Sequence, residues 1–390
     1  MIDVDELTRT LLPHDAERAR LVGRVSVPGL GPSVVLVDGD EVVELTGRGL
    51  PTVAALLAQP DPVAACRPGP DATRWSLAEV VAATVAEDRE RPRLLAPIDL
   101  QVVKACGVTF VESMLERVIE ERAAGDPERA AELRERIGTA IGGSLRSIVP
   151  GSDQAQEVAR MLKAEGMWSQ YLEVGIGADP EVFTKAPVLS SVGCGVDIGV
   201  RPDSHWNNPE PELVLLVGPD GRIRGATLGN DVNLRDFEGR SALLLGEAKD
   251  NNASSALGPF VRLLDQDYGL DDLRSTQIDL RVTGSDGFVL EGSNSLEQIS
   301  RDLLDLVGHV TAHHQYPDGF ALFTGTLFAP IQDRERPGGG FTHHRDDVVR
   351  IHNDRLGTLV NRVRSTDEVA PWEFGISALM ENLAVRGLLG

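Results

Sequence analysis

Short apolar runs separated by polar turns open the chain, and this alternation is typical of β-strands. Residues 33–37 and 41–45 are two such runs, and an Asp-Gly-Asp turn at 38–40 stands between them. An Asp-Gly turn between two apolar runs predicts a β-hairpin. Apolar positions at helical spacing then predict two helices, at 51–58 and 76–87.

A helical block interrupts the β-rich pattern further on. The charged, proline-containing run 87–97 predicts a linker, and the strand-like residues 98–110 follow it. About sixty residues with helical periodicity come next, and we interpret 111–170 as a helical lid inserted beside a site. Three helices are expected there from their apolar stripes and one strong N-cap: Val111, Leu115 and Val118 in the first; Ala130, Leu133, Ile137 and Ile141 behind the cap Asp126 in the second; Ala155, Val158 and Leu162 in the third.

The rest of the chain reads mostly as strands and loops. Helices are expected only at 295–314 and 374–388. We therefore predict an α+β fold that is mostly β, with a small N-terminal α+β domain at 1–97 and a larger catalytic domain at 98–390.

Three carboxylates stand at the open end of a hairpin expected in mid-chain. Glu210 and Glu212 precede the apolar run 213–217, and the chain returns after a Gly-Pro-Asp-Gly turn to Asp231. Side chains at i and i+2 of a strand share a face, and antiparallel pairing brings Asp231 beside Glu210. Burying three uncompensated carboxylates is costly, whereas a hard cation such as Mg²⁺ prefers oxygen ligands. The pattern predicts a metal-dependent enzyme; the competing interpretation is a solvated strand edge with incidental acids.

Composition excludes several classes of partner. The 390 residues carry a net charge of −22, which argues against nucleic acid or an anionic membrane, because both attract clustered Lys and Arg. No apolar run approaches the roughly 20 residues of a membrane span. The acidic N-terminus lacks the pattern of a signal peptide, so a cytoplasmic location is expected. Cys66, Cys106 and Cys194 are isolated and are interpreted as packing residues.

Other chemistry is weaker in this sequence. His309 and His313 have a spacing that can bind zinc, but no acid between them completes an HExxH motif, and a partly exposed helix face explains them better. The glycine runs do not join a strand to a helix at the spacing that nucleotide binding requires, and a Gly-x-Ser-x-Gly elbow is absent from the sequence. Lys249 reads as a surface lysine, although a lysine partly buried beside a divalent cation can serve as a base.

The motifs taken together resemble the fumarylacetoacetate hydrolase family. Its Gly-Asn-Asp-Val-x-x-Arg-Asp signature after a Glu-x-Glu strand is matched at 229–236, and five further segments agree over 98–363. These are the Phe-x-Lys-x-Pro step at 183–187, the Asn-Ser turn at 293–295, the Thr-Gly-Thr strand at 318–326, and the closing strands at 346–349 and 356–361. The resemblance implies a β-sandwich roll or barrel with a helical lid.

The resemblance also assigns residues. The family's metal ligands fall on Glu210, Glu212 and Asp231, its active-site lysine on Lys249, and its carboxylate-binding threonine on Thr326. Further substrate-binding candidates from the matching motifs are Lys185, Arg235, Thr109 and Asn294.

One departure from the family indicates the reaction. Hydrolases of the family carry Asn-Tyr-x-x-His-x-x-Glu in the lid, where His and Glu activate water, whereas residues 109–116 here keep Glu116 but have Ser113 in place of His. The segment is similar to the family's sugar-acid branch, which includes 2-keto-3-deoxy-pentonate dehydratases. The hypothesis is a Mg²⁺-dependent dehydratase in which Lys249 is the base, Glu116 the acid, and Ser113 positions the departing hydroxyl.

Several alternatives stay open. The same metal site suits acylpyruvate or fumarylacetoacetate-type hydrolysis, oxaloacetate decarboxylation or tautomerisation, and a non-catalytic keto-acid binder is a further possibility. Mn²⁺ and Ca²⁺ suit carboxylate ligands as Mg²⁺ does. The resemblance implies a small-molecule 2-keto acid as partner and a homodimer or homotetramer as assembly.

Overall fold

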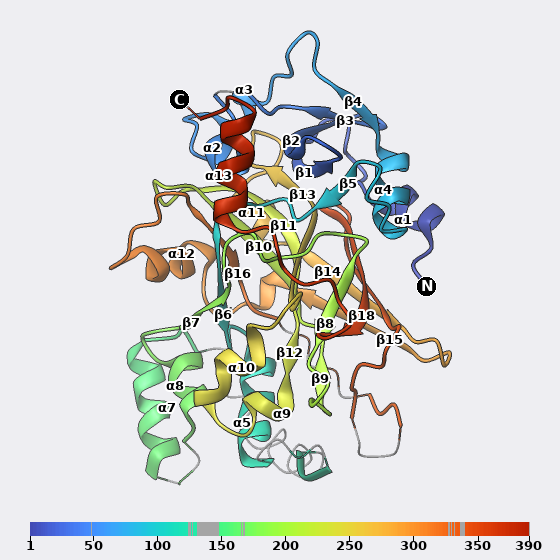
Figure 1. The fold of residues 1–390 in the computed structure, drawn as a ribbon. Coiled ribbons are helices and arrows are strands. Elements are labelled where there is room, and N and C mark those ends of the chain that lie inside the picture. Colours follow the sequence, from blue (N-terminus) through green and yellow to red (C-terminus); the bar gives the residue numbers. More distant parts are fainter. Residues whose placement is uncertain are drawn as a thin grey trace.

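The computed structural model describes most of the chain (Figure 1). Its description leaves out residues 48, 124, 125, 127, 131–147, 165, 167, 327, 329, 331, 336–339 and 390, and the side chains of 111–113, 115 and 120. Most of the predicted second lid helix, including the stripe from Leu133 to Ile141, therefore lies outside the described residues. The side chain of Ser113 lies outside them as well.

An eleven-stranded mixed sheet forms the centre of the molecule. The strand order is β4-β3-β2-β1-β13-β11-β10-β16-β6-β7, with β5 paired to β1. The hairpin expected around 38–40 is confirmed, since β2 and β3 pair antiparallel there. The strands are β1 (Leu21–Val27), β2 (Gly31–Asp38), β3 (Glu41–Glu44), β4 (Arg74–Ser76), β5 (Arg93–Leu95), β6 (Val102–Gly107), β7 (Glu181–Ala186), β10 (Pro211–Val217), β11 (Ile223–Asp231), β13 (Ser255–Leu263) and β16 (Phe320–Phe323).

A five-stranded sheet packs against this centre. Its order is β15-β14-β17-β18-β8, and its inward-facing side chains join the same apolar core as β10 and β11. Both sheets have free ends over the described residues, so neither closes into a barrel. The remaining strands are β8 (Asp197–Val200), β14 (Gln277–Thr283), β15 (Val289–Ser295), β17 (Val348–Asn353) and β18 (Gly357–Ser365), with β9 (Asn207–Asn208) and β12 (Asn233–Leu234) paired separately.

Strand β10 is apolar on both faces because it is buried on both. Leu213 and Leu215 join the core between the two sheets, whereas Val214 and Leu216 join a second core with Val53 of the N-terminal segment. A strand covered on both sides reads as a continuous apolar run instead of an alternating one. This double burial gives the acidic residues at its start a rigid support.

The N-terminal segment extends the central sheet. Strand β1 pairs antiparallel with β13, and Arg24 on β1 donates a hydrogen bond to the carbonyl of Ile98. Asp99 caps α2 through the backbone N–H groups of Val53 and Ala54. The division at residue 97 stays a prediction. The helices of this segment are α1 (Val4–Thr10), α2 (Val53–Leu57), α3 (Pro62–Ala65) and α4 (Leu77–Val85).

The lid helices gather at the opposite end of the molecule from the N-terminal segment (Figure 1). They are α5 (Val111–Ala123), α7 (Asp153–Ala164) and α8 (Gln170–Ile176), and they share a small apolar core of their own. The helices expected near 295–314 and 374–388 are present but shorter, because Asp302 starts the first and residue 386 ends the second. The others are α9 (Arg235–Glu238), η1 (Ala242–Leu244), α10 (Leu245–Lys249), α11 (Leu270–Arg274), η2 (Leu296–Gln298), α12 (Leu303–Thr311) and α13 (Ile376–Val385). Among the described helices, none combines the length and apolarity that crossing a bilayer requires.

Candidate metal centre and active site

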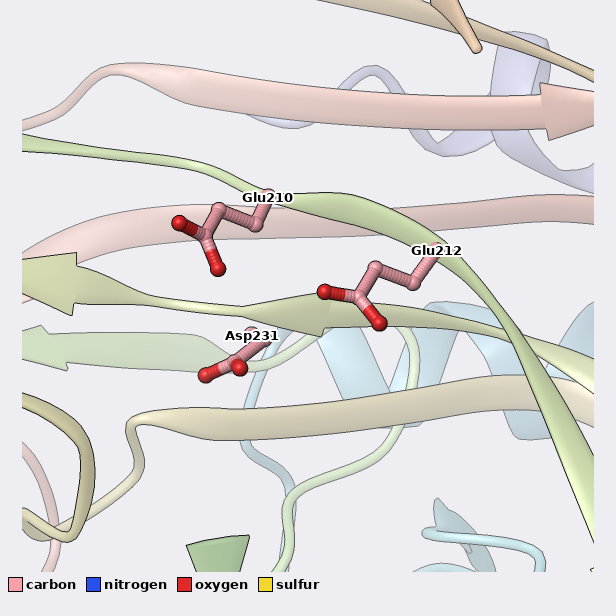
Figure 2. Close-up of side chains that lie close together, drawn as sticks. All are labelled: Glu210, Glu212 and Asp231. Atoms are coloured by element: carbon pink, nitrogen blue, oxygen red, sulfur yellow. The ribbon is translucent and has the colours of Figure 1, made fainter. Parts of the chain in front are cut away.

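The three carboxylates of the mid-chain hairpin converge as the sequence predicts. Strands β10 and β11 pair antiparallel, and the backbone N–H of Asp231 donates to the carbonyl of Glu210 at 3.0 Å. One carboxylate oxygen from each of Glu210, Glu212 and Asp231 lies within 4.8 Å of the others (Figure 2). Their exposed fractions are 4%, 2% and 2%, so the interpretation as a solvated strand edge is wrong.

Hydrogen bonds from neighbouring elements fix the strand that carries the glutamates. The side chain of Asn230 accepts from the backbone N–H of Glu210 at 3.1 Å, and Asn294 donates to the carbonyl of Pro211 at 3.1 Å. The backbone N–H of Gly325 donates to Oε2 of Glu212 at 2.6 Å. The first two contacts hold the backbone and the third orients one carboxylate, so the ligand oxygens are positioned in advance.

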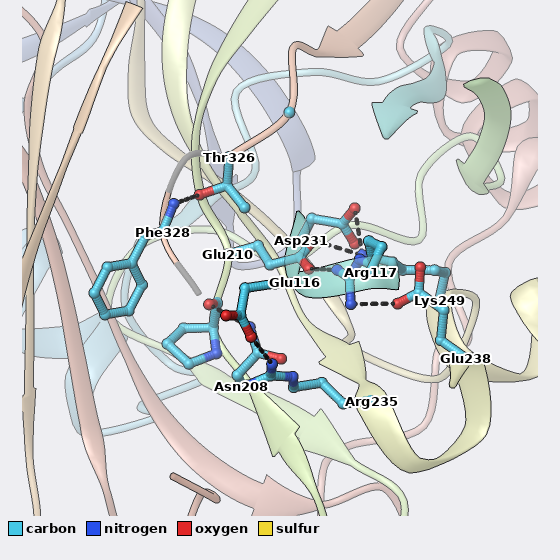
Figure 3. Close-up of polar contacts among 12 residues, drawn as sticks. Glu116, Arg117, Asn208, Glu210, Asp231, Arg235, Glu238, Lys249, Thr326 and Phe328 are labelled. Carbon is cyan, nitrogen blue, oxygen red and sulfur yellow. Dashed lines mark hydrogen bonds and ion pairs between the residues drawn. The ribbon is translucent and has the colours of Figure 1, made fainter. Parts of the chain in front are cut away.

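Three basic side chains contact this acidic group, and Figure 3 shows two of them, Arg117 and Lys249. The Nζ of Lys249 lies 2.5 Å from Oε2 of Glu210 and 3.1 Å from Oδ2 of Asp231. The Nζ of Lys185 lies 2.8 Å from Oδ1 of Asp231 and also donates to the carbonyls of Val232 and Lys249. Arg117, on lid helix α5, bridges Glu210 at 2.5 Å and Glu238 at 3.0 Å.

Formal charges in this region do not balance. Five acidic side chains (Glu181, Glu210, Glu212, Asp231 and Glu238) face three basic ones (Arg117, Lys185 and Lys249) among the described residues, which leaves −2 when all are ionised. Excess buried charge is strongly unfavourable, and one divalent cation cancels it. The donor set is entirely carboxylate oxygen, as Mg²⁺ requires. The residues present therefore fit a magnesium ion.

The pKa values carry the same imbalance. Burial and the carboxylates of Asp231 and Glu210 raise the pKa of Glu212 well above its usual range. Burial alone would lower the pKa of Lys249, but Asp231 and Glu210 outweigh it and raise that pKa. In this arrangement Lys249 is an ammonium group. For Asp231, burial acts to raise the pKa, but Lys185 and Lys249 dominate and lower it.

A small cavity adjoins the three carboxylates. Its volume is about 20 Å³, enough for one water-sized body and far below the roughly 300 Å³ at the lower end for small-molecule sites. Its lining is formed by Cys106, Gly107, Val108, Arg117, Glu181, Phe183, Glu210, Glu212, Asp231, Glu238, Lys249, Gly325 and Thr326.

Glu181 is a functional candidate that the sequence analysis missed. Its carboxylate lies against Gly107, where a Cβ atom would overlap Oε2 of Glu181, so a larger residue at 107 would force this carboxylate to move. Burial and the neighbouring Glu238 raise the pKa of Glu181 to about 7. A carboxyl group with this pKa can exchange protons near neutral pH. The sequence offered one signal for this residue. Glu181 stands two residues before Phe183 and four before Lys185 of the family motif, and the period of two in a strand predicts a shared face.

The other sequence-predicted residues take different places. Thr326 lines the cavity beside the carboxylates, as does Lys249. Lys185 is fully buried behind Asp231 and does not line the cavity. The hydroxyl of Thr109 donates to the carbonyl of Thr324 at 2.7 Å, which fixes the start of the lid, and Asn294 braces β10.

Glu116 and Arg235 form a pair outside the cavity lining. Their charged groups lie 3.5 Å apart, Arg235 donates to the carbonyl of Pro330 at 3.1 Å, and its guanidinium stacks on Trp206. The substrate and acid roles expected for Lys185, Arg235, Thr109, Asn294 and Glu116 stay predictions. Arg117 and Glu238, which the sequence analysis did not select, line the cavity instead.

Comparison with known proteins identifies the family. Residues 170–364 match the model of the family described as Fumarylacetoacetate (FAA) hydrolase C-terminal. The chain is 30% identical over 199 residues to 2-dehydro-3-deoxy-D-arabinonate dehydratase of Saccharolobus solfataricus, a match that covers 51% of this chain and 63% of that protein. It is 32% identical over 212 residues to the probable 2-keto-3-deoxyxylonate dehydratase of Haloferax volcanii, covering 54% and 68%. The chain thus matches less than two thirds of the first of these relatives.

Solved structures share the fold. The apo form of 2-keto-3-deoxy-D-arabinonate dehydratase superposes with a TM-score of 0.63 at 22% identity, over 89% of this chain and 99% of that chain. The same enzyme complexed with magnesium and 2,5-dioxopentanoate gives 0.61 at the same identity and coverage. This likeness confirms the predicted α+β, mostly β fold class. The chain belongs to the fumarylacetoacetate hydrolase family and resembles its sugar-acid dehydratases.

Proposed function

We propose that this protein is a Mg²⁺-dependent hydro-lyase that dehydrates a 2-keto-3-deoxy sugar acid. The observation that carries the proposal is the convergence of Glu210, Glu212 and Asp231 in a buried cluster whose formal charge is −2 when all its groups, Lys185 included, are ionised. The names of the two curated relatives support the substrate class, a 2-keto-3-deoxy-pentonate. The product would be 2-oxoglutarate semialdehyde, also called 2,5-dioxopentanoate, plus water.

Glu210, Glu212 and Asp231 would hold the magnesium ion. The ion would supply a Lewis acid for the keto oxygen of the substrate and stabilise the negative charge that develops there. Thr326 lies in the cavity wall, where its hydroxyl can donate to the substrate carboxylate. Gly325 keeps Glu212 oriented through its backbone N–H.

Two groups in the cavity wall suit the proton transfers. The reaction removes a proton from C3 and the hydroxyl from C4, which leaves a C3=C4 double bond. Transfer of a proton from C5 to C3 then gives the C4=C5 enol, and protonation of C4 with loss of the enol O–H proton gives the C5 aldehyde. Glu181, with its pKa of about 7, would accept the C3 proton. Lys249, which is an ammonium beside Asp231 and Glu210 in the metal-free structure, would donate a proton to the departing C4 oxygen. We therefore propose Lys249 as the donor and Glu181 as the acceptor, whereas the sequence analysis predicts Lys249 as the base and Glu116 as the acid.

Access to the cavity requires movement of its wall. A five-carbon acid does not fit into about 20 Å³, so substrate entry must displace side chains that line the cavity. Arg117 is the one lining residue, among those described, that the lid helices contribute. Return of the lid over the bound acid would exclude water, which favours elimination over hydrolysis.

Incubation of the purified protein with candidate acids tests the proposal. We expect Mg²⁺-dependent release of the semialdehyde from 2-keto-3-deoxy-xylonate or 2-keto-3-deoxy-arabinonate, and loss of turnover with a chelator. Turnover of acylpyruvates alone would support the hydrolase alternative instead, and oxaloacetate would test the decarboxylase alternative. Use of Mn²⁺ or Ca²⁺, a homodimeric or homotetrameric assembly and a cytoplasmic location remain predictions.

A further inference from the structure

Arg117 joins the lid to a metal ligand. It lies on α5, its side chain is 13% exposed, and its two terminal nitrogens contact different carboxylates. One contact is to Oε1 of Glu210, and the other is to Oε2 of Glu238 on α9. Only Glu210 belongs to the group of three that can hold a cation. The guanidinium therefore spans one metal ligand and one carboxylate outside the metal site.

The contact with Glu210 opposes metal binding. Both oxygens of Glu210 already face a cation, Arg117 on one side and Lys249 on the other, each at 2.5 Å. A divalent ion that takes an oxygen of Glu210 comes within a few ångströms of the guanidinium, and like charges at that distance repel each other more strongly in a buried site than in water. Release of Arg117 from Glu210 weakens this repulsion.

Glu238 is a second carboxylate partner for Arg117. When the contact with Glu210 breaks, the contact at 3.0 Å with Glu238 can persist, so the charge on Arg117 remains paired. Movement of Arg117 would also affect the packing of α5. Ile119 and Ala123 of this helix pack against Trp206, which lies close to the pair formed by Glu116 and Arg235. Arg117 also forms part of the wall of a cavity too small for a keto acid.

We propose that Arg117 is a positioning residue that holds lid helix α5 on Glu210 in the metal-free protein and that metal binding displaces it toward Glu238. Metal loading thereby loosens α5 and makes room for the keto acid, so the cation binds first and the acid second. This inference rests on the metal site of the proposed function.

Magnesium titration without any keto acid tests the inference. Isothermal titration calorimetry of the full-length protein should give a Mg²⁺ dissociation constant for Arg117→Gln that is at least about five-fold lower than for the parent chain. The reason is that the guanidinium charge, which competes with Mg²⁺ for Glu210, is gone. Arg122→Gln removes the same charge from the same helix, at a residue outside the cavity lining among those described, and should stay within about two-fold of the parent. Arg117→Lys keeps the charge without spanning both carboxylates and should fall between the two.

Weaker or unchanged Mg²⁺ binding in Arg117→Gln would overturn the proposed role of Arg117. An Arg117→Gln chain that binds Mg²⁺ about 10- to 100-fold more weakly would make Arg117 a residue that orients Glu210 for the metal. Equal Mg²⁺ affinity in all variants would also reject the proposal that Arg117 and the metal compete for Glu210. A parent chain that binds no Mg²⁺ would remove the metal site, and with it the proposed function.

Hydrogen exchange over α5 supplies a second measurement. Mg²⁺ should speed amide exchange in residues 114–123 of the parent chain. In Arg117→Gln, exchange should already be fast without Mg²⁺ and should not respond to it. Slower exchange with Mg²⁺ in both chains would contradict the proposal, and thermal unfolding of each variant verifies that it is folded.

Discussion

Two buried ionic clusters in this molecule differ in their balance of charge. The first is the cluster of Glu210, Glu212 and Asp231 with its basic neighbours. The second joins the loop after Thr326 to the five-stranded sheet. There Arg334 makes two contacts with Asp347, at 2.6 and 2.8 Å, and His343 lies 3.4 Å from the same carboxylate.

The buried pair at the centre of the second cluster is balanced. Arg334 and Asp347 have side chains that are 1% and 0% exposed, whereas Asp286, at 3.2 Å from Arg334, is 45% exposed and its charge is screened by solvent. Burial acts to raise the pKa of Asp347, but hydrogen bonds from Arg334 and His343 outweigh it and lower that pKa to about 2. In the first cluster the carboxylate of Glu212 has a raised pKa instead.

The difference separates structural from functional ion clusters. A buried pair with matched charge stabilises the fold once formed, and its loss leaves an unpaired charge. A buried cluster with excess charge destabilises the fold until a bound ion or ligand of opposite charge neutralises it. Excess charge in a cavity therefore marks the site where a ligand or ion is expected. The predictions below test this distinction.

The largest effect should come from the unbalanced cluster. Glu212→Gln removes one metal ligand, and we expect Mg²⁺-dependent turnover to fall by about 10³-fold or more. Because the change also removes excess negative charge, thermal stability without Mg²⁺ should stay equal or rise. Glu291→Gln, at an exposed pair on β15, is the control and should leave both quantities unchanged. A Glu212→Gln enzyme with full activity would remove the metal from the mechanism.

Breaking the balanced cluster should have the opposite profile. Asp347→Asn leaves Arg334 buried without its main partner, and the free energy of unfolding should fall by about 3–5 kcal/mol. Mg²⁺ affinity should change less than about two-fold. The neighbouring Asp346→Asn disrupts an ion pair with Arg364 whose acid is 41% exposed, and should cost about 1 kcal/mol or less. Denaturant unfolding and calorimetry measure the two quantities.

Glu181 should control the pH dependence of turnover. As a base it must be ionised, so kcat/KM should decline as pH falls below an apparent pKa at or under about 7, since the bound cation lowers the pKa further. Glu181→Gln should lower kcat by about 10²- to 10⁴-fold and remove this acidic limb. Glu173→Gln, at an exposed lid residue, serves as control. If kcat/KM of Glu181→Gln still declines at acidic pH, this pH dependence belongs to another group.

The smallest effect is the acid dependence of stability. The pKa of Asp347 is about 2 in the folded protein, against an ordinary value of 3.8. The unfolded chain therefore takes up the proton first as pH falls. The resulting stabilisation of about 2 kcal/mol should be complete above about pH 4 and should disappear between about pH 4 and 2. The difference in unfolding free energy between the parent and Asp347→Asn should shrink by about 2 kcal/mol over this range; parallel curves would contradict the assignment.

The metal cluster was predictable because its geometry is local. A strand, a four-residue turn and a returning strand bring Asp231 beside Glu210, and the period of two places Glu212 on the same face. The same local logic predicted the hairpin at 38–40. Family motifs added Lys249 and Thr326, both of which line the cavity.

Distant contacts decided the rest. Arg117 and Glu181 reach the cavity from the lid and from β7, Thr109 turns to the carbonyl of Thr324, and β1 joins the central sheet through β13. Hydrophobic periodicity reports which face of an element is buried, but it does not report which other element covers that face. The sequence by itself determined the three carboxylates and the hairpin that holds them. Only the tertiary structure decided which charges surround them, because those charges come from segments that packing, and not chain proximity, brings together.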